Sequence, residues 1–246
     1  MEENVLQDLL SAMEDNPKLW EWIRKLDAGT GTYEEASSIA ELLGDEIAKQ
    51  LAAMYTPEQL EAYARAGHDI VSMVSEAAQQ NLNDAARIGL KPMTTKYPKA
   101  KVSALEAELA LVGQEKLPDE IKNALPSFVM SLVDDIVKYN ADFQAKAGLK
   151  PVIVRTWSGS YPSHDTKHTD WCHDLAGTYD YNSRMNNRVF VRHKGCRCKV
   201  KYFPDQAAKG RITALAKGEI DREGVLWNTR AETLESRIRK ASKRNK

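Results

Sequence analysis

The sequence predicts an α+β protein with three parts: a helical region over residues 1–148, a small β module that holds a Cys/His cluster over 149–204, and a basic helical tail over 205–246. Helix-capping signals and apolar residues at helical spacing fill the first part. At Pro151 the pattern changes to a β-branched run, PVIVRTW, which is typical of a strand. All three cysteines and four of the five histidines then fall between residues 164 and 198.

Start signals predict three helices in the first 88 residues. Each signal places Asn or Thr at the N-cap, with proline or a Glu/Gln in the first turn that follows. The pairs are Asn16-Pro17, Thr32-Glu35 and Thr56-Gln59. We expect the third of these helices to end near Gly89.

A loop and two more helices complete the helical region. Residues 89–101 contain two prolines, four lysines and no acidic residue, and this composition predicts a loop, exposed or bound to a partner. A short helix is expected from Ser103. A longer one is expected from Pro126, and it ends at Gly148.

The β module is predicted to contain a hairpin. Residues 188–192 and 199–203 both alternate between apolar and charged or polar residues, as half-buried strands do. The short segment from His193 to Cys198 would join them as a tight turn, with potential metal ligands at its tip.

The Cys/His cluster predicts a structural zinc site. Structural zinc takes four tetrahedral ligands, mainly Cys thiolates and His imidazoles. Cys172, Cys196 and Cys198 are the first choices as ligands, followed by His193 and then His168. The simpler interpretation is that the cysteines are small buried hydrophobic residues, but their density and their place on a hairpin favour a metal.

No catalytic residue is predicted, although a catalytic site is an alternative. Asp170 and Asp174 flank Cys172 and would supply a general base beside a zinc ion. Three thiolates would weaken that ion as a Lewis acid. His193 would otherwise act as the base of a nuclease that uses Mg²⁺, but the sequence offers no second set of acidic ligands for that ion.

Charge is divided unequally along a chain of zero net charge. Residues 184–246 contain 18 Lys/Arg and 6 Asp/Glu, about +12, and residues 1–183 contain the remaining 17 and 29, about −12. The basic part would meet a polyanion or an acidic partner, or the two parts would neutralise each other within the chain. The candidate DNA-binding residues are Lys199, Lys201, Arg237, Arg239, Lys240, Lys243 and Arg244.

The segment WCHDLAGTYDY followed by VFVRHKGCRCKVKYFP resembles the C-terminal signature of phage head-morphogenesis proteins, the minor capsid proteins related to the Mu F family. The resemblance covers about residues 126–204. The residues that match the two blocks of the signature are Trp171, Cys172, Leu175, Ala176, Gly177, Thr178 and Tyr179, and Phe190, Arg192, His193, Cys196, Arg197 and Cys198.

This resemblance implies a structural, non-enzymatic component of a tailed phage or prophage, located in the virion and, during assembly, in the host cytoplasm. Its partners would be the portal or major capsid protein, together with phage DNA bound without sequence specificity. It would act in head assembly or in DNA packaging or delivery. The family has a first cysteine where this chain has Thr169, so His168 or His193 would complete a zinc site, or zinc is lost. No 18-residue apolar run predicts a membrane span and no signal peptide is visible. The alternatives are a metal-dependent nuclease or toxin-like enzyme, and a DNA-binding accessory module.

Overall fold

The computed structural model describes residues 2–158, 172–181, 187–204 and 233–243. Within them the fold is mainly helical, with one small antiparallel sheet. The helices are α1 (Glu2–Glu14), α2 (Pro17–Asp27), α3 (Tyr33–Ala53), α4 (Pro57–Ala85), α5 (Lys99–Ala110), α6 (Leu117–Lys146) and α9 (Leu234–Lys243), with a 3₁₀ turn, η1 (Asn187–Phe190). The strands are β1 (Val152–Thr156), β2 (Gly177–Asp180) and β3 (Lys199–Phe203).

The predicted start signals of the first helices are confirmed. Asn16 caps α2, and its side chain accepts a hydrogen bond from the Lys18 N–H. Thr32 opens α3 with a reciprocal capping box, in which Glu35 accepts from the Thr32 N–H at 2.8 Å. The Thr56 hydroxyl accepts from the Gln59 N–H at the start of α4. These contacts satisfy N–H groups that have no partner inside a helix.

Two predicted helix starts are wrong. The predicted loop ends at Pro98, because α5 begins at Lys99 rather than at Ser103. The helix expected from Pro126 begins nine residues earlier, at Leu117, with Pro118 in its first turn and Pro126 inside it. The rule that proline favours the first helical turn therefore applies here to the earlier of two prolines.

The predicted hairpin is also wrong. Residues 187–190 form η1, and β3 pairs with β1 instead, in a sheet of order β2-β1-β3. Ile153, the second residue of β1, lies opposite Tyr179 of β2 and Tyr202 of β3. The carbonyl oxygens of Val189 and Val191 accept hydrogen bonds from the Arg155 side chain (2.6 and 2.9 Å), so this segment satisfies them without a strand partner.

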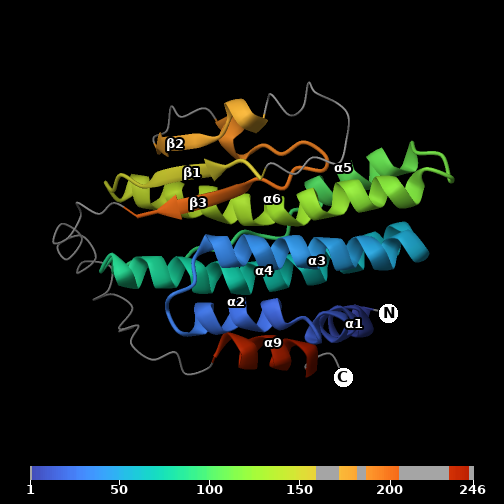
Figure 1. Ribbon diagram of the computed structural model, residues 1–246, viewed down its shortest axis with the longest axis horizontal. Helices are drawn as coiled ribbons and strands as arrows, with labels where there is room; N and C mark the ends of the chain where they lie inside the picture. Colours follow the sequence, from blue (N-terminus) through green and yellow to red (C-terminus); the bar gives the residue numbers. More distant parts are fainter. Residues whose placement is uncertain (1, 159–171, 182–186, 205–232, 244–246) are drawn as a thin grey trace.

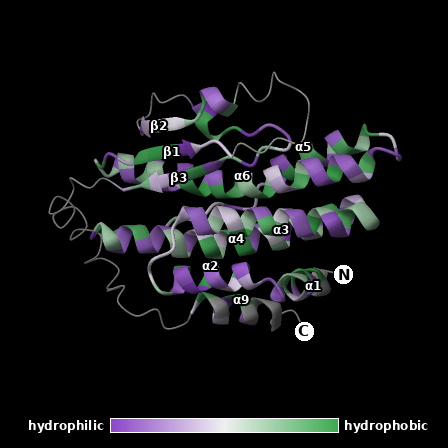
Figure 2. Ribbon diagram, in the orientation of Figure 1, coloured by the Kyte–Doolittle hydropathy of each residue, from purple (hydrophilic) through white to green (hydrophobic). Residues whose placement is uncertain are grey.

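The elements are stacked in layers (Figure 1). The sheet lies on the side of α6, α3 and α4 occupy the middle, and α1, α2 and α9 lie on the opposite side. Hydrophobic and hydrophilic residues alternate along the helices in the manner of amphipathic helices (Figure 2). Ile153, Val200 and Tyr202 belong to the same buried core as the helices, so one core crosses the predicted boundary at 148/149.

A buried polar network also fastens the sheet to the helices. The Tyr33 hydroxyl of α3 donates to Gln79 Oε1 of α4 at 2.9 Å. Gln79 and Gln144 both donate to Asn83 Oδ1, and the Tyr202 hydroxyl of β3 donates to Gln144 of α6. Because buried polar atoms are costly without partners, this network favours one relative placement of its four elements.

Candidate metal centre

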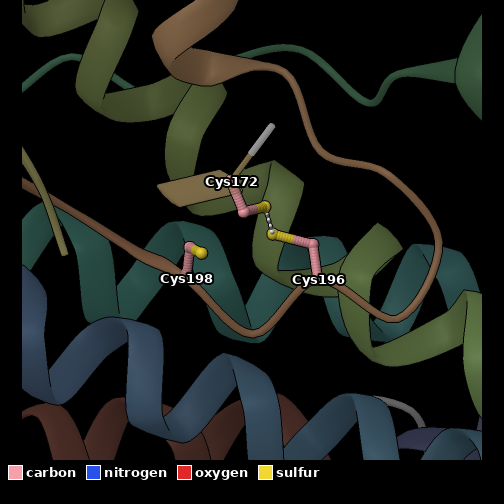
Figure 3. A group of neighbouring side chains, drawn as sticks. All are labelled: Cys172, Cys196 and Cys198. Atoms are coloured by element: carbon pink, nitrogen blue, oxygen red, sulfur yellow. Dashed lines mark hydrogen bonds between the residues drawn. The ribbon is translucent and has the colours of Figure 1, made fainter. Parts of the chain in front are cut away.

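The three cysteines meet at one buried point between the sheet and α6. Cys172 begins a helical turn just before β2, and Cys196 and Cys198 lie on the segment that leads into β3. Each is at most 2% exposed, and their Sγ atoms lie within 4.8 Å of one another. Figure 3 shows the three side chains converging from these separate segments. Three buried thiols this close could hold a metal ion.

The spacing of two of these sulfur atoms fits a tetrahedral metal. Cys172 Sγ lies 3.7 Å from Cys196 Sγ. Two ligands at the usual zinc–sulfur distance of about 2.3 Å are separated by about 3.8 Å in a tetrahedron. A disulfide would require a sulfur–sulfur distance of about 2.0 Å, and all three cysteines are free.

His193 stands beside the three thiols. Its Nε2 lies 2.8 Å from Cys172 Sγ, and its Nδ1 lies 2.7 Å from the Lys194 carbonyl oxygen. A carbonyl acceptor holds the proton on Nδ1 and leaves the Nε2 lone pair for a metal, as in most metal-binding histidines. Of the two predicted histidine ligands, His193 is thus close to the thiols, and His168 lies outside the described residues.

A tight turn positions the second pair of cysteines. Gly195 has φ = 73°, in the left-handed region that glycine adopts without a steric cost. The turn is closed by a hydrogen bond from the Cys196 N–H to the His193 carbonyl (3.1 Å), and it is fastened to α6 by one from the Gly195 N–H to the Asn123 carbonyl (3.0 Å). Lys194 adds ion pairs with Glu108 of α5 and Glu120 of α6.

Two buried arginines surround the thiols, and the sequence did not single out either as a site residue. Arg155 of β1 is 1% exposed, and its guanidinium lies 3.4 Å from Cys196 Sγ and 3.7 Å from Cys172 Sγ. The Arg192 guanidinium donates to the Cys198 carbonyl at 2.6 Å and forms a two-pronged pair with Asp134 of α6 (2.5 and 2.9 Å). The sequence feature that could have identified Arg155 was its position as a charged residue inside the β-branched run PVIVRTW.

The shared hydrogen bonds divide the protons unequally among the thiols. Hydrogen bonds from Cys172 and Cys198 hold the pKa of Cys196 well below its ordinary value. The same sharing, with burial, raises the pKa of Cys172. The guanidinium groups of Arg155 and Arg192, which lie near Cys196 Sγ, act in the same direction because they favour the charged form of the thiol.

The predicted DNA-binding residues that can be placed are mostly engaged within the chain. Lys199 donates to the Ser38 hydroxyl of α3 (2.6 Å), and Lys201 pairs with Glu34 of the same helix (2.7 Å). Arg237 of α9 pairs with Glu76 of α4 (2.7 Å), and Lys240 is exposed. The side chains of Arg239 and Lys243, and all of Arg244, lie outside the described residues. These pairs agree with neutralisation inside the chain, and DNA binding stays a prediction.

Of the two aspartates considered as the general base of a catalytic site, only Asp174 lies among the described residues. Asp174 has an exposed side chain that lies 3.9 Å from the exposed His173, and Asp170 lies outside the described residues. Within the parts of the chain that are described, the three cysteines are the only metal-type cluster, with no acidic group of that kind. No helix of these parts is both long and apolar enough to cross a membrane.

Comparisons with known proteins assign no family: no family model, no curated protein and no solved structure matches the chain. The fold and the centre define a mainly helical α+β protein in which a buried cysteine cluster brings together two segments that lead into strands of a three-stranded sheet.

Proposed function

We propose that this protein is a minor capsid or head-morphogenesis protein of a tailed bacteriophage, acting at the portal or in the capsid interior during head assembly or DNA packaging or delivery. One observation supports the proposal. The residues that carry the sequence resemblance, among them Cys172, Arg192, His193, Cys196 and Cys198, gather at a single centre. A signature whose residues converge in space is better explained by a shared structural requirement than by chance spacing.

The centre, in this proposal, is a structural zinc site of the ribbon or treble-clef kind, with three cysteine ligands and His193 as the fourth. When bound, the ion would supply cross-linking between segments far apart in the sequence. Its charge suits the surroundings: three thiolates, Asp134, Arg155, Arg192 and one divalent ion sum to a formal charge of zero. The protein's own residues orient the ligands, since Arg192 fixes the loop on Asp134 and the Lys194 carbonyl oxygen accepts a hydrogen bond from His193 Nδ1.

A structural role is preferred to a catalytic one for two reasons. Three thiolates and one histidine fill the four positions of a tetrahedral ion, so none is open for substrate or water. The three thiols are also buried, which limits access from solvent. The basic residues would then serve non-specific contact with phage DNA, and the acidic helices would suit portal or capsid partners.

The decisive experiment for the phage function is mass spectrometry of purified procapsids and virions from the phage or prophage that encodes the chain. We expect the protein in at least one of the two particles, in few copies. Absence from both would refute the proposal. Cleavage of DNA in Mg²⁺ or Mn²⁺ that disappears in a His193→Ala variant would instead establish the nuclease alternative.

The metal is tested separately by elemental analysis of His193→Ala and of a matched histidine control, His173→Ala. His173 is exposed and its ring packs on Trp157 at 5.4 Å between ring centroids. We expect about one zinc ion per chain in the control and a clearly lower zinc content without His193, because one of the four ligands is lost. Equal zinc contents in both variants would exclude His193 as a ligand.

A further inference from the structure

The Arg155 side chain contacts two cysteines of the metal centre that come from different segments of the chain. Its Nη2 donates to Cys196 Sγ at 3.4 Å and to Cys172 Sγ at 3.7 Å. The two sulfur atoms are themselves 3.7 Å apart, the contact that is drawn as a dashed line in Figure 3. One guanidinium nitrogen thus touches both members of the pair whose spacing suits a tetrahedral ion.

The other half of the same guanidinium holds this nitrogen in place. Nη1 donates to the carbonyl oxygens of Val189 and Val191, at 2.6 and 2.9 Å, and Arg155 is almost completely buried. Because a guanidinium is planar and rigid, fixing Nη1 also fixes the direction of Nη2. Val191 lies two residues before His193, so these contacts also place the backbone that leads to the proposed histidine ligand.

The positive charge of Arg155 matters because metal ligands must be thiolates rather than thiols. In a poorly solvated site, negative charges on Cys172 and Cys196 repel each other strongly over a few ångströms. A guanidinium that donates to both sulfur atoms offsets this repulsion, and arginine side chains in proteins remain charged. Groups that hydrogen-bond to metal ligands in this way typically change the metal affinity about 10- to 100-fold when they are removed.

We propose that Arg155 is a positioning residue of the metal centre. It holds Cys172 and Cys196 at the spacing that a tetrahedral ion needs, and its Nη2 donates to their sulfur atoms while they bind the ion. Arg155 is not itself a ligand, because a guanidinium has no lone pair to offer. This role rests on the proposed zinc site and deepens it. It differs from the role of Arg192, which fixes its segment to Asp134 of α6.

The test loads the full-length chain with cobalt(II), whose thiolate-to-metal charge-transfer absorption reports on the sulfur ligands. A hydrogen bond lowers the energy of the electrons on a thiolate sulfur. Its loss in Arg155→Met should therefore shift the charge-transfer band to longer wavelength. Competition with a chelator should also show a zinc affinity about 10- to 100-fold weaker than that of the unchanged chain. Arg155→Lys keeps a positive charge but not the planar fork, so its band and affinity should lie between the two.

Two control variants separate this role from a general loss of stability. Ile153→Val shortens a buried side chain of the same strand and should lower the melting temperature. Arg188→Met removes an exposed arginine at η1. We expect both controls to keep the band position and the zinc affinity of the unchanged chain.

The possible outcomes distinguish Arg155 from the zinc site as a whole. An unshifted band with unchanged zinc affinity in Arg155→Met would overturn the role of Arg155 and leave the zinc site in place. An equal shift in Ile153→Val would overturn it too, since the band would then report on strand packing. An unchanged chain that binds neither cobalt nor zinc would refute the zinc site itself, and this role with it. If Arg155→Met does not fold, the band and affinity of Arg155→Lys decide in the same way.

Discussion

The pair formed by Asp134 and Arg192 should carry much of the stability that fixes the cysteine segment to the helices. Asp134 is completely buried and the Arg192 side chain is 3% exposed. Removing one partner of a buried pair costs about 3–5 kcal/mol, because the other charge is left in a poorly solvated place. In the Asp134→Ala variant, Arg192 keeps its bond to the Cys198 carbonyl. We therefore expect a loss near the lower end of that range, about 3 kcal/mol.

The neighbouring residue provides the control. Asp135 also forms an ion pair, with Lys101 at 2.5 Å, but both side chains are a third or more exposed. Asp135→Ala should cost about 0–1 kcal/mol. Urea unfolding followed by circular dichroism measures both losses, provided that each transition is two-state. A difference of less than about 1 kcal/mol between the two variants would refute the reasoning. The double variant Asp134→Leu with Arg192→Met should recover most of the lost stability, since it leaves no unpaired charge.

Three further predictions concern the packing, the charge pairs and the metal. Gly44→Ala should lower the stability by about 1–3 kcal/mol, since its Cβ would lie 2.6 Å from the Pro126 Cα; Gly113→Ala, with nothing within 4 Å, is the thermal-melting control. The pKa of Glu34 is lowered by its hydrogen bond from Lys201, so Lys201→Ala should raise it in an NMR titration, whereas Lys240→Ala should not. The pair stabilises the fold above the ordinary pKa of Glu34, and this contribution is lost as the pH falls through the lowered pKa. Lys201→Ala should remove this pH-dependent contribution to stability. Changing Cys196 and Cys198 together to serine should abolish zinc in elemental analysis; an unchanged zinc content would place the ion elsewhere.

Local signals predicted where α2, α3 and α4 begin, because capping depends on residues within one turn. Thr32 and Thr56 form their caps with neighbours three residues away. Pro126 misled the prediction because its setting is tertiary: it lies against Gly44 of α3, where the two helices come close together. No local pattern distinguishes a proline that begins a helix from one held inside it by such packing.

The centre was predicted only as a set of residue types. The spacing of Cys172, His193, Cys196 and Cys198 indicated soft metal ligands in one window, and the structure brings all four together. The partners of the centre could not be predicted, because Asp134 is 58 residues from Arg192 along the chain and Arg155 is 17 from Cys172. The predicted hairpin failed because the consecutive residues Val189 and Phe190 are both buried in the 3₁₀ turn η1, whereas a half-buried strand would bury only every second residue.

The opposite charges of the two parts of the chain have a structural explanation in the way the sheet is held. Lys201 of β3 and Arg197 just before it pair with acids of α3, and Arg192 pairs with α6. Lys194 in the cysteine turn reaches α5 and α6. The sheet side of the chain is therefore basic where the helices beneath it are acidic. A metal among the three thiols would link the segment before β2 to the segment before β3, beside contacts with the helices that ion pairs already hold. Loss of the metal should accordingly loosen the segments around the cysteines before it releases β3, an order that hydrogen exchange can measure segment by segment.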